Sequence, residues 1–267
     1  MDSLRNKAKE LLDSKAVQVV VGYENGSKDK IRAAFITDAT QINRLVFNEK
    51  CTQNLAIYLV KEEVKHMGKI AIVATIPVMR TINVLISECQ VTEENLVVLG
   101  ISPEGQLLDF PTISVMENYL QSIQHENPDK DKLAIEKIKK MTKQERWDYW
   151  KQTLETCFKC YACRAACPLC YCTRCAVECN QPQWIPVAPH KHGNMDWHMM
   201  RGMHLAGRCI SCGECGRACP LDIPCHLLTM YLADEVHSMY GEKSGMKADM
   251  ESVLSSYKPN DKENFIL

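Results

Sequence analysis

The chain of 267 residues has no excess of charge of either sign, with 32 Lys and Arg against 33 Asp and Glu and a formal net charge of −1. A nucleic-acid-binding protein is usually strongly basic, so we expect no nucleic acid among the partners. Long apolar runs are also missing. Runs such as residues 16–21 fall far short of the roughly 20 residues that a transmembrane helix needs, so we expect no membrane span.

Motifs that mark an active site are missing as well. Neither the Gly-x-Gly-x-x-Gly pattern of dinucleotide-binding folds nor the Gly-x4-Gly-Lys-Ser/Thr phosphate loop occurs. No Ser/His/Asp constellation can be argued, so no catalytic residue is assigned. The segment that begins at Met1 is amphipathic and charged, unlike a secretory signal peptide, which indicates a cytoplasmic protein.

Cysteine is the residue in excess, with 15 in the chain. All of them except Cys51 and Cys89 lie between Cys157 and Cys225. A secreted disulfide scaffold is smaller and spreads its cysteines through the whole fold. Thiols gathered in one part of a chain from a reducing compartment indicate metal binding instead.

Two segments share the spacing C-x2-C-x2-C-x3-C-P. The first motif contains Cys157, Cys160, Cys163 and Cys167, and the second contains Cys209, Cys212, Cys215 and Cys219. This is the spacing of bacterial two-cluster ferredoxins, in which the fourth cysteine of each motif binds the other cluster. A proline after the fourth cysteine suits the first turn of a helix, where no hydrogen bond is lost.

The spacing therefore predicts two [4Fe–4S] clusters with crossed ligands. The expected sets are Cys157, Cys160, Cys163 and Cys219 for the first cluster, and Cys209, Cys212, Cys215 and Cys167 for the second. Basic residues outnumber acidic ones between Cys157 and Cys225, which would partly offset the negative charge of the clusters. The histidines of this region, at 190, 192, 198 and 204, are expected at the surface or behind the ligands.

A further group follows the first motif and comprises Cys170, Cys172, Cys175 and Cys179. At four cysteines per cubane, this group would supply a third [4Fe–4S] cluster. A zinc site with four cysteine ligands is one alternative, and unligated thiols packed between the clusters are another. Cys51, Cys89 and Cys225 stand alone, either as small buried hydrophobic residues or as stray ligands, so their role stays open.

Residues 1–125 alternate between helical and extended patterns. The apolar spacing predicts helices at 4–12, 54–67 and 78–89, strands at 16–21, 31–36, 69–75 and 95–101, and a turn at 22–26. Strands separated by helices imply crossover connections. The N-terminal domain is therefore expected to be α/β, with a mainly parallel sheet covered on both faces.

The remaining chain divides into three expected parts. A polar stretch at 124–131 indicates a domain boundary, and the pattern over 132–155 predicts one long helix, so residues 126–156 are expected to be a linker helix. Residues 157–243 would form a mostly α-helical dicluster ferredoxin domain, with helices at 196–205 and 225–240. The polar tail, 244–267, is expected to fray.

Several short runs of the sequence resemble known families. Residues 34–38, 45–51, 54–59, 88–91 and 94–101 resemble the N-terminal region of the beta subunits of coenzyme F420-reducing hydrogenase and formate dehydrogenase. Residues 157–168, with Cys170 and Cys172, are similar to the formate dehydrogenase branch. Residues 204–209 and the helical pattern after Cys219 resemble the two-cluster ferredoxin-type component of heterodisulfide reductase.

This resemblance implies an iron–sulfur electron-transfer subunit of a cytoplasmic, anaerobic, multi-subunit oxidoreductase. Its partners would be a molybdenum- or tungsten-dependent dehydrogenase, or a hydrogenase, and a flavin-containing or heterodisulfide-reductase-like subunit. The N-terminal domain, 1–125, would dock the clusters to these partners. In such a subunit the cysteines hold cofactors and the protein sets their spacing and potential.

Beta subunits of this kind often carry FAD and reduce a deazaflavin. This chain departs from them at residues 76–79, where Ile-Pro-Val-Met precedes Arg80 and the family often has Gly-Cys-Asp. FAD is therefore not expected here. The alternative is an FAD-containing subunit that itself reduces coenzyme F420 or NAD. Whether the chain is an enzyme stays open, and a non-catalytic subunit is favoured.

Overall fold

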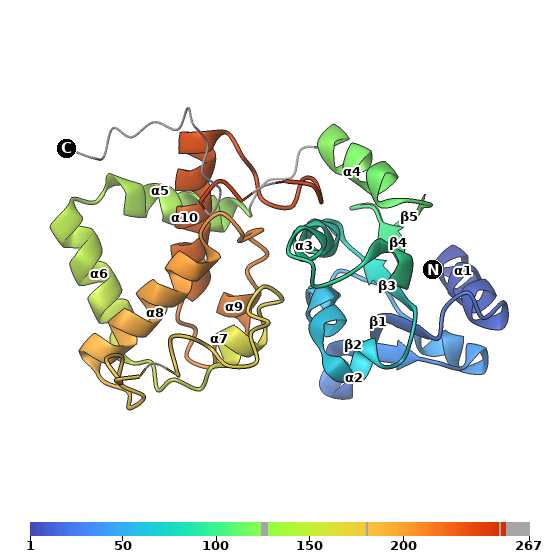
Figure 1. Ribbon diagram of the computed structural model, residues 1–267, viewed down its shortest axis with the longest axis horizontal. Coiled ribbons are helices and arrows are strands. Elements are labelled where there is room, and N and C mark those ends of the chain that lie inside the picture. Colours follow the sequence, from blue (N-terminus) through green and yellow to red (C-terminus); the bar gives the residue numbers. More distant parts are fainter. Residues whose placement is uncertain (124–127, 180, 251, 255–267) are drawn as a thin grey trace.

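The computed structural model describes residues 1–123, 128–179, 181–250 and 252–254. The expected boundary at 125–126 and the end of the polar tail, 255–267, lie outside the described residues. The chain forms an N-terminal half built on a β-sheet and a C-terminal half built from helices (Figure 1). The two cysteine motifs lie in the helical half.

A five-stranded sheet in the order β2-β1-β3-β4-β5 forms the centre of the N-terminal half. Its strands are β1 (Val19–Asn25), β2 (Ile31–Ile36), β3 (Ile70–Ala74), β4 (Leu96–Ile101) and β5 (Leu107–Phe110). The central strands β1, β3 and β4 are parallel, whereas β2 and β5 pair antiparallel with their neighbours. The sheet is therefore mixed, and the prediction of a mainly parallel sheet is not accurate. Its edge strands return through tight connections instead of crossover helices.

The first strand is longer than its apolar run indicated. Residues 22–25, predicted as a turn, continue β1 and pair with β2, and the turn lies at 26–30. Lys28 and Asp29 adopt left-handed conformations there. Gly22 lies inside the strand against Leu45, whose side chain would have to move to admit a Cβ, because that atom would lie 2.3 Å from Leu45 Cδ1.

Helices and 3-10 turns connect and cover these strands. They are α1 (Asp2–Asp13), η1 (Ser27–Asp29), η2 (Ala39–Arg44), η3 (Leu55–Val60), α2 (Glu62–Lys65), α3 (Ile76–Ser87), η4 (Glu93–Asn95) and α4 (Ile113–Ser122). The helix predicted at 54–67 is instead η3 followed by α2, because Lys61 has an extended backbone between them (φ −87°, ψ 128°). The sequence pattern did not reveal β5 or α4.

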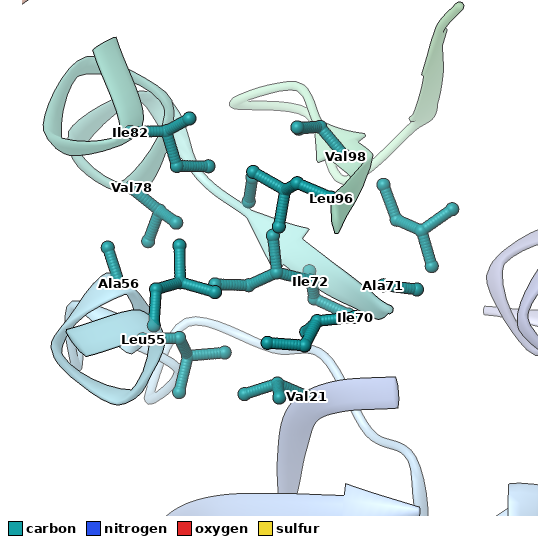
Figure 2. Packing of buried hydrophobic residues seen from close by; sticks show 14 of the residues in the cluster. Val21, Leu55, Ala56, Ile70, Ala71, Ile72, Val78, Ile82, Leu96 and Val98 are labelled. Carbon is teal, nitrogen blue, oxygen red and sulfur yellow. The ribbon is translucent and has the colours of Figure 1, made fainter. Parts of the chain in front are cut away.

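The core of the N-terminal half forms between the sheet and the elements on its face. Leu55 and Ala56 of η3 and Val78 and Ile82 of α3 gather around Ile72 of β3 (Figure 2). All five residues of β3 are buried, as the continuous apolar run of a central strand requires. This packing fixes α3, whose other side faces the cysteine motifs.

The C-terminal half contains α5 (Asp129–Lys140), α6 (Lys143–Glu155), α7 (Ala162–Ala165), α8 (Lys191–Leu205), α9 (Glu214–Arg217) and α10 (Cys225–Tyr240). The single helix predicted over 132–155 is two helices, because Thr142 and Glu145 form a capping box that starts α6. Helix α6 packs on α8, α10 packs on α5, α8 and α9, and the short helices α7 and α9 pack on each other (Figure 1).

The segment after α10 joins the two halves. The guanidinium of Arg80 on α3 donates to Ser244 O (2.6 Å) and to Ile210 O (3.1 Å), and Asn83 Nδ2 donates to Gly245 O (3.1 Å). The amide of Ala248 donates to a carboxylate oxygen of Glu117 on α4. The chain is therefore held in place well beyond Lys243, where fraying was expected. Within the described ranges, no helix combines the length and the apolar character needed to cross a bilayer.

Candidate iron–sulfur centre

The first motif begins directly after α6. The amide of Cys157 donates to Leu154 O (3.2 Å), which ends the helix and starts the cysteine loop. Lys159 and Tyr161 have positive φ angles of 55° and 59°, so the backbone reverses twice before α7. In this conformation the amide of Lys159 donates to Cys157 Sγ over 3.4 Å. The loop therefore directs a backbone N–H group at the sulfur of its first cysteine.

The second motif repeats this geometry after α8. The amide of Cys209 donates to Leu205 O (2.8 Å), and Ser211 and Gly213 have φ angles of 61° and 76°. The amide of Ser211 donates to Cys209 Sγ, again over 3.4 Å. Each loop then enters a four-residue helix, α7 or α9. N–H···S bonds of this kind favour a thiolate and raise the potential of a cluster that it binds.

The contact between α7 and α9 brings the two motifs face to face. Burial raises the pKa of Cys157, and the nearby thiols of Cys163, Cys160 and Cys219 raise it further. Cys219, although part of the second motif, therefore lies within electrostatic range of Cys157. Crossed ligation requires Cys219 to lie near the cysteines of the first motif, and this position beside Cys157 agrees with it.

A small cavity marks the second site. Its lining contains Cys167, Cys209, Cys212 and Cys215, together with apolar residues that include Leu205 and Ile210. These cysteines are the set predicted for the second cluster. Burial raises the pKa of Cys212 to about 12, which favours the protonated thiol. As a ligand of iron, Cys212 would lose this proton, as any coordinating thiol does.

The ligand sets divide largely, though not completely, between two hydrophobic cores. Cys167, Cys209 and Cys212 pack with the core of the sheet domain, whereas Cys157, Cys163 and Cys219 pack with the core of the helical half, which also contains Cys215 of the second set. The fourth cysteine of each motif thus packs in the core that contains the first cysteine of the other motif. The donor set, its N–H···S bonds and the cavity all fit cubanes bound by four thiolates.

The additional cysteines do not share one environment. Cys170 lies beside Cys167, and the hydrogen bond between these thiols is the main reason why the pKa of Cys170 falls to about 6. Cys172 and Cys179 are exposed and Cys175 is partly buried. Among the described residues, no three His, Cys, Asp or Glu side chains are arranged to bind a single metal ion. A cubane holds its ligands farther apart than one ion does, so this finding concerns single-ion geometry.

The isolated cysteines differ from one another. Cys51 is buried and its sulfur accepts a hydrogen bond from the Asn48 amide (3.3 Å), as expected for a small core residue. Cys89 is exposed, contrary to the buried interpretation. Cys225 is buried at the start of α10, where its thiol donates to Cys215 O (3.2 Å) and lies close to Cys163 and Cys215. It is therefore a neighbour of the expected ligands.

The region also contains buried polar residues beside the cysteines, of which the sequence indicated only His198, as one of four histidines expected at the surface or behind the ligands. His198 is buried, with Nε2 lying 3.4 Å from Cys157 Sγ. Asn194 Nδ2 donates to Cys157 O (2.7 Å) and to Leu154 O (3.1 Å), which ties α8 to the first cysteine loop. Arg80 and Arg201 are buried cations beside the cysteines. In the sequence these are ordinary helical residues, and only the fold brings them to the sulfurs.

Comparison with known proteins agrees with this geometry. The family model described as a 4Fe-4S dicluster domain matches residues 169–224. The match contains the second motif and the group from Cys170 to Cys179, and it begins just after the first motif. Residues 169–224 are therefore similar to the domains that hold two [4Fe–4S] clusters.

A second comparison gives a relative with a named function. A stretch of 61 residues is 38% identical to the F420-dependent formate dehydrogenase subunit beta of Methanocaldococcus jannaschii. That stretch is 22% of this chain and 15% of the relative, so most of each protein lies outside the similarity. The chain therefore contains a 4Fe-4S-type segment. Over the 61 residues of this second similarity it resembles a formate dehydrogenase beta subunit.

Proposed function

We propose that this chain is the iron–sulfur electron-transfer subunit of a cytoplasmic, anaerobic oxidoreductase complex, and that it relays single electrons between a catalytic subunit and an acceptor module. One observation carries the proposal: the two cysteine loops have the same backbone geometry and face each other across α7 and α9. A pair of such loops holds redox cofactors at a fixed separation, which is what an electron relay needs.

The proposed ligand sets are crossed. Cys157, Cys160, Cys163 and Cys219 would bind the first cluster, and Cys167, Cys209, Cys212 and Cys215 would bind the second. The cavity lined by the second set and the position of Cys219 beside Cys157 support this assignment. The family match begins after the first motif, so the assignment of Cys157, Cys160 and Cys163 depends on the equivalence of the two loops.

The group Cys170, Cys172, Cys175 and Cys179 would supply a third [4Fe–4S] cluster, with a zinc site as the competing proposal. Its placement beside the second site, through Cys170 and Cys167, supports a role in the same electron path. A third cluster here would bring electrons to exposed positions of the chain, because Cys172 and Cys179 are exposed.

The partners we propose are a molybdenum- or tungsten-dependent dehydrogenase, or a hydrogenase, and a flavin-containing or heterodisulfide-reductase-like subunit. The name of the formate dehydrogenase relative supports the first. In this proposal residues 1–125 are the docking domain, 126–156 the linker, 157–243 the ferredoxin domain and 244–267 the tail. Arg80 and Glu88 of the docking domain contact the cluster region directly, which supports a coupling between docking and the second site.

A second candidate function has one observation in its favour. A cavity of about 490 Å³, lined by residues that include Glu88, Tyr171, Cys172, Arg208 and Lys247, lies between the two halves. Its size falls in the range of small-molecule sites. A flavin held there would make the chain a subunit that itself reduces coenzyme F420 or NAD.

The deciding experiment is anaerobic purification followed by iron, zinc and flavin analysis and by spin spectroscopy of the reduced protein. The relay predicts about 8 to 12 irons per chain, no stoichiometric flavin, reduced-cluster signals, and no turnover of formate by the isolated chain. About eight irons with one zinc would assign zinc to the additional cysteines. Four irons or fewer in intact protein would refute the relay, and stoichiometric flavin would favour the second candidate.

A further inference from the structure

Arg201 is one of the deeply buried cations of the cluster region. It lies on α8 with 5% of its surface exposed, and its Nη2 donates to the backbone oxygen of Cys163 over 3.0 Å. Its Nε is buried and has no hydrogen-bond partner. A buried guanidinium with an unused donor needs a compensating acceptor or negative charge nearby.

Sulfur atoms from both proposed ligand sets surround this side chain. Cys163 belongs to the first set and Cys167 and Cys215 to the second, and Cys170 also lies close. As thiolates, these groups favour the charged form of the guanidinium, and the positive charge of Arg201 in turn contributes to the lowered pKa values of Cys170 and Cys215. Arg201 is therefore hydrogen-bonded to the first motif through Cys163 O and lies within electrostatic range of sulfurs from both ligand sets.

Three other arginines of this region have carboxylate partners. Arg164 pairs with Glu178 (3.3 Å), Arg208 pairs with Glu88, and Arg217 pairs with Glu214. No Asp or Glu among the described residues forms an ion pair with Arg201. Because an unpaired buried charge is strongly unfavourable, the compensation has to come from the sulfur ligands.

We propose that Arg201 is a shared counter-charge of both clusters, which raises the reduction potential of each and lowers the repulsion between them when both are reduced. The inference depends on the proposed ligand sets. A fixed positive charge favours the added electron at either site, and net charge is one of the determinants of a cluster's potential. One residue placed between two clusters acts on both.

The neighbouring polar groups act on one site each. Arg80 lies beside Cys209 and Cys212 of the second site, and His198 lies beside Cys157 of the first. Lys159, whose amide bonds Cys157 Sγ, is also a first-site residue, and its ammonium donates to the backbone oxygens of Pro186 and Ala188. A change at Arg201 should therefore differ from a change at any of these by shifting both potentials.

The test is a redox titration of the purified chain, followed by spin spectroscopy, in the variants Arg201→Gln, Arg201→Lys and Arg164→Gln. We expect Arg201→Gln to reduce the ratio of reduced to oxidised cluster about tenfold at both sites, a shift of about 59 mV for a one-electron couple. Arg201→Lys keeps the charge and should stay near the parent protein. Arg164→Gln removes the same unit of charge next to Cys163 in sequence, but from a side chain that is 23% exposed and screened by water, so it should shift either potential much less.

The outcomes separate this inference from the proposed function. A parent protein without two clusters would refute the proposed function. Two clusters in the parent, with potentials that Arg201→Gln leaves unchanged or shifts at one site only, would overturn the inference alone. If Arg201→Gln loses iron, Arg201→Lys decides: retained clusters at parent potentials support a charge role, whereas loss of iron there as well assigns Arg201 a purely structural role.

Discussion

His198 and Cys157 come from different parts of the chain and meet at the first cluster site, with Nε2 lying 3.4 Å from Sγ. Burial lowers the pKa of His198 to about 4, and the charges of Arg201 and Lys159 contribute, so the imidazole is neutral near pH 7. Toward an iron-bound thiolate a neutral imidazole can only donate its N–H. The sulfur of Cys157 then receives this bond in addition to that from the Lys159 amide.

Replacing His198 with Phe removes this donor and keeps an aromatic ring in the buried position. We expect the potential of the first cluster to fall and that of the second to stay unchanged, because hydrogen bonds to cluster sulfurs raise the potential. His204→Phe, at an exposed position of the same helix, is the matched control. Redox titration measures both clusters, and an equal shift at both would contradict a local role for His198.

Crossed ligation predicts which cysteine substitutions act together. Cys219→Ala should alter the same cluster signal as Cys157→Ala, although it lies beside the second motif in sequence. Cys167→Ala should alter the same signal as Cys212→Ala. Spin spectra of the reduced variants separate the two components, and exposed Cys89→Ala serves as the control that leaves both intact. If Cys219→Ala and Cys212→Ala damage the same component, each motif binds its own cluster.

The pair of Glu88 and Arg208 should stabilise the contact between the two halves. Arg208 Nη2 donates to Glu88 Oε2 over 2.7 Å, and Tyr171 Oη donates to the same carboxylate over 3.0 Å. Glu88→Gln should lower the free energy of unfolding by about 2 kcal/mol, the usual value for hydrogen bonds to a charged group. Glu62→Gln, which breaks an exposed pair with Lys65, should cost less than about 0.5 kcal/mol. Urea unfolding compares them, and equal losses would argue against a structural role for the Glu88 pair.

Two glycines with similar backbone angles should tolerate alanine very differently. Gly245 (φ +76°) lies against α3, where a Cβ would be 2.3 Å from Arg80 O. Gly241 (φ +72°) has open space around the same position. Gly241→Ala should cost about 1 kcal/mol through backbone strain alone. Gly245→Ala should cost about 3 kcal/mol, because the steric overlap adds to that strain. Similar melting temperatures for both variants would show that the segment after α10 is not anchored at Arg80.

Removing iron should loosen the cysteine loops before the sheet. Helices α7 and α9 have four residues each, far fewer than an isolated helix needs, and thus depend on their surroundings. After anaerobic chelation, amide hydrogen exchange should become fast at 157–167 and 209–219. Strands β1, β3 and β4, with their buried side chains, should keep their protection. Unchanged exchange in both loops would mean that they fold without metal.

The cysteine motifs could be predicted from the sequence because the ligands of a cluster follow one another at short, fixed spacings. Most of the central strands could also be predicted, because their apolar runs are continuous. The buried cations could not be predicted from the sequence. The residues around Arg201 are typical of any helix, and its burial results from the position of α8 beside both cysteine loops. His198 became a partner of Cys157 for the same reason.

Errors in the predicted elements also have local physical causes. The capping box of Thr142 and Glu145 divides the helix predicted at 132–155, and this Thr-x-x-Glu pattern was readable in the sequence. The edge strand β5 has only four residues, too few for a clear alternation. The antiparallel edges arise from tight returns in the chain, which the pattern of strands and helices did not distinguish from crossovers.

The two cysteine loops have the same backbone geometry but differ in how far their side chains are exposed to solvent. At the first loop, Cys160 and the neighbouring Phe158 are exposed, whereas Cys209 and Cys212 of the second loop are partly buried and line a small cavity with Leu205 and Ile210. We therefore expect dioxygen and other dissolved oxidants to reach the first site sooner. Damage by air should follow an order, with the first cluster degraded while the second persists, and protein handled briefly in air should retain one cluster signal of the two.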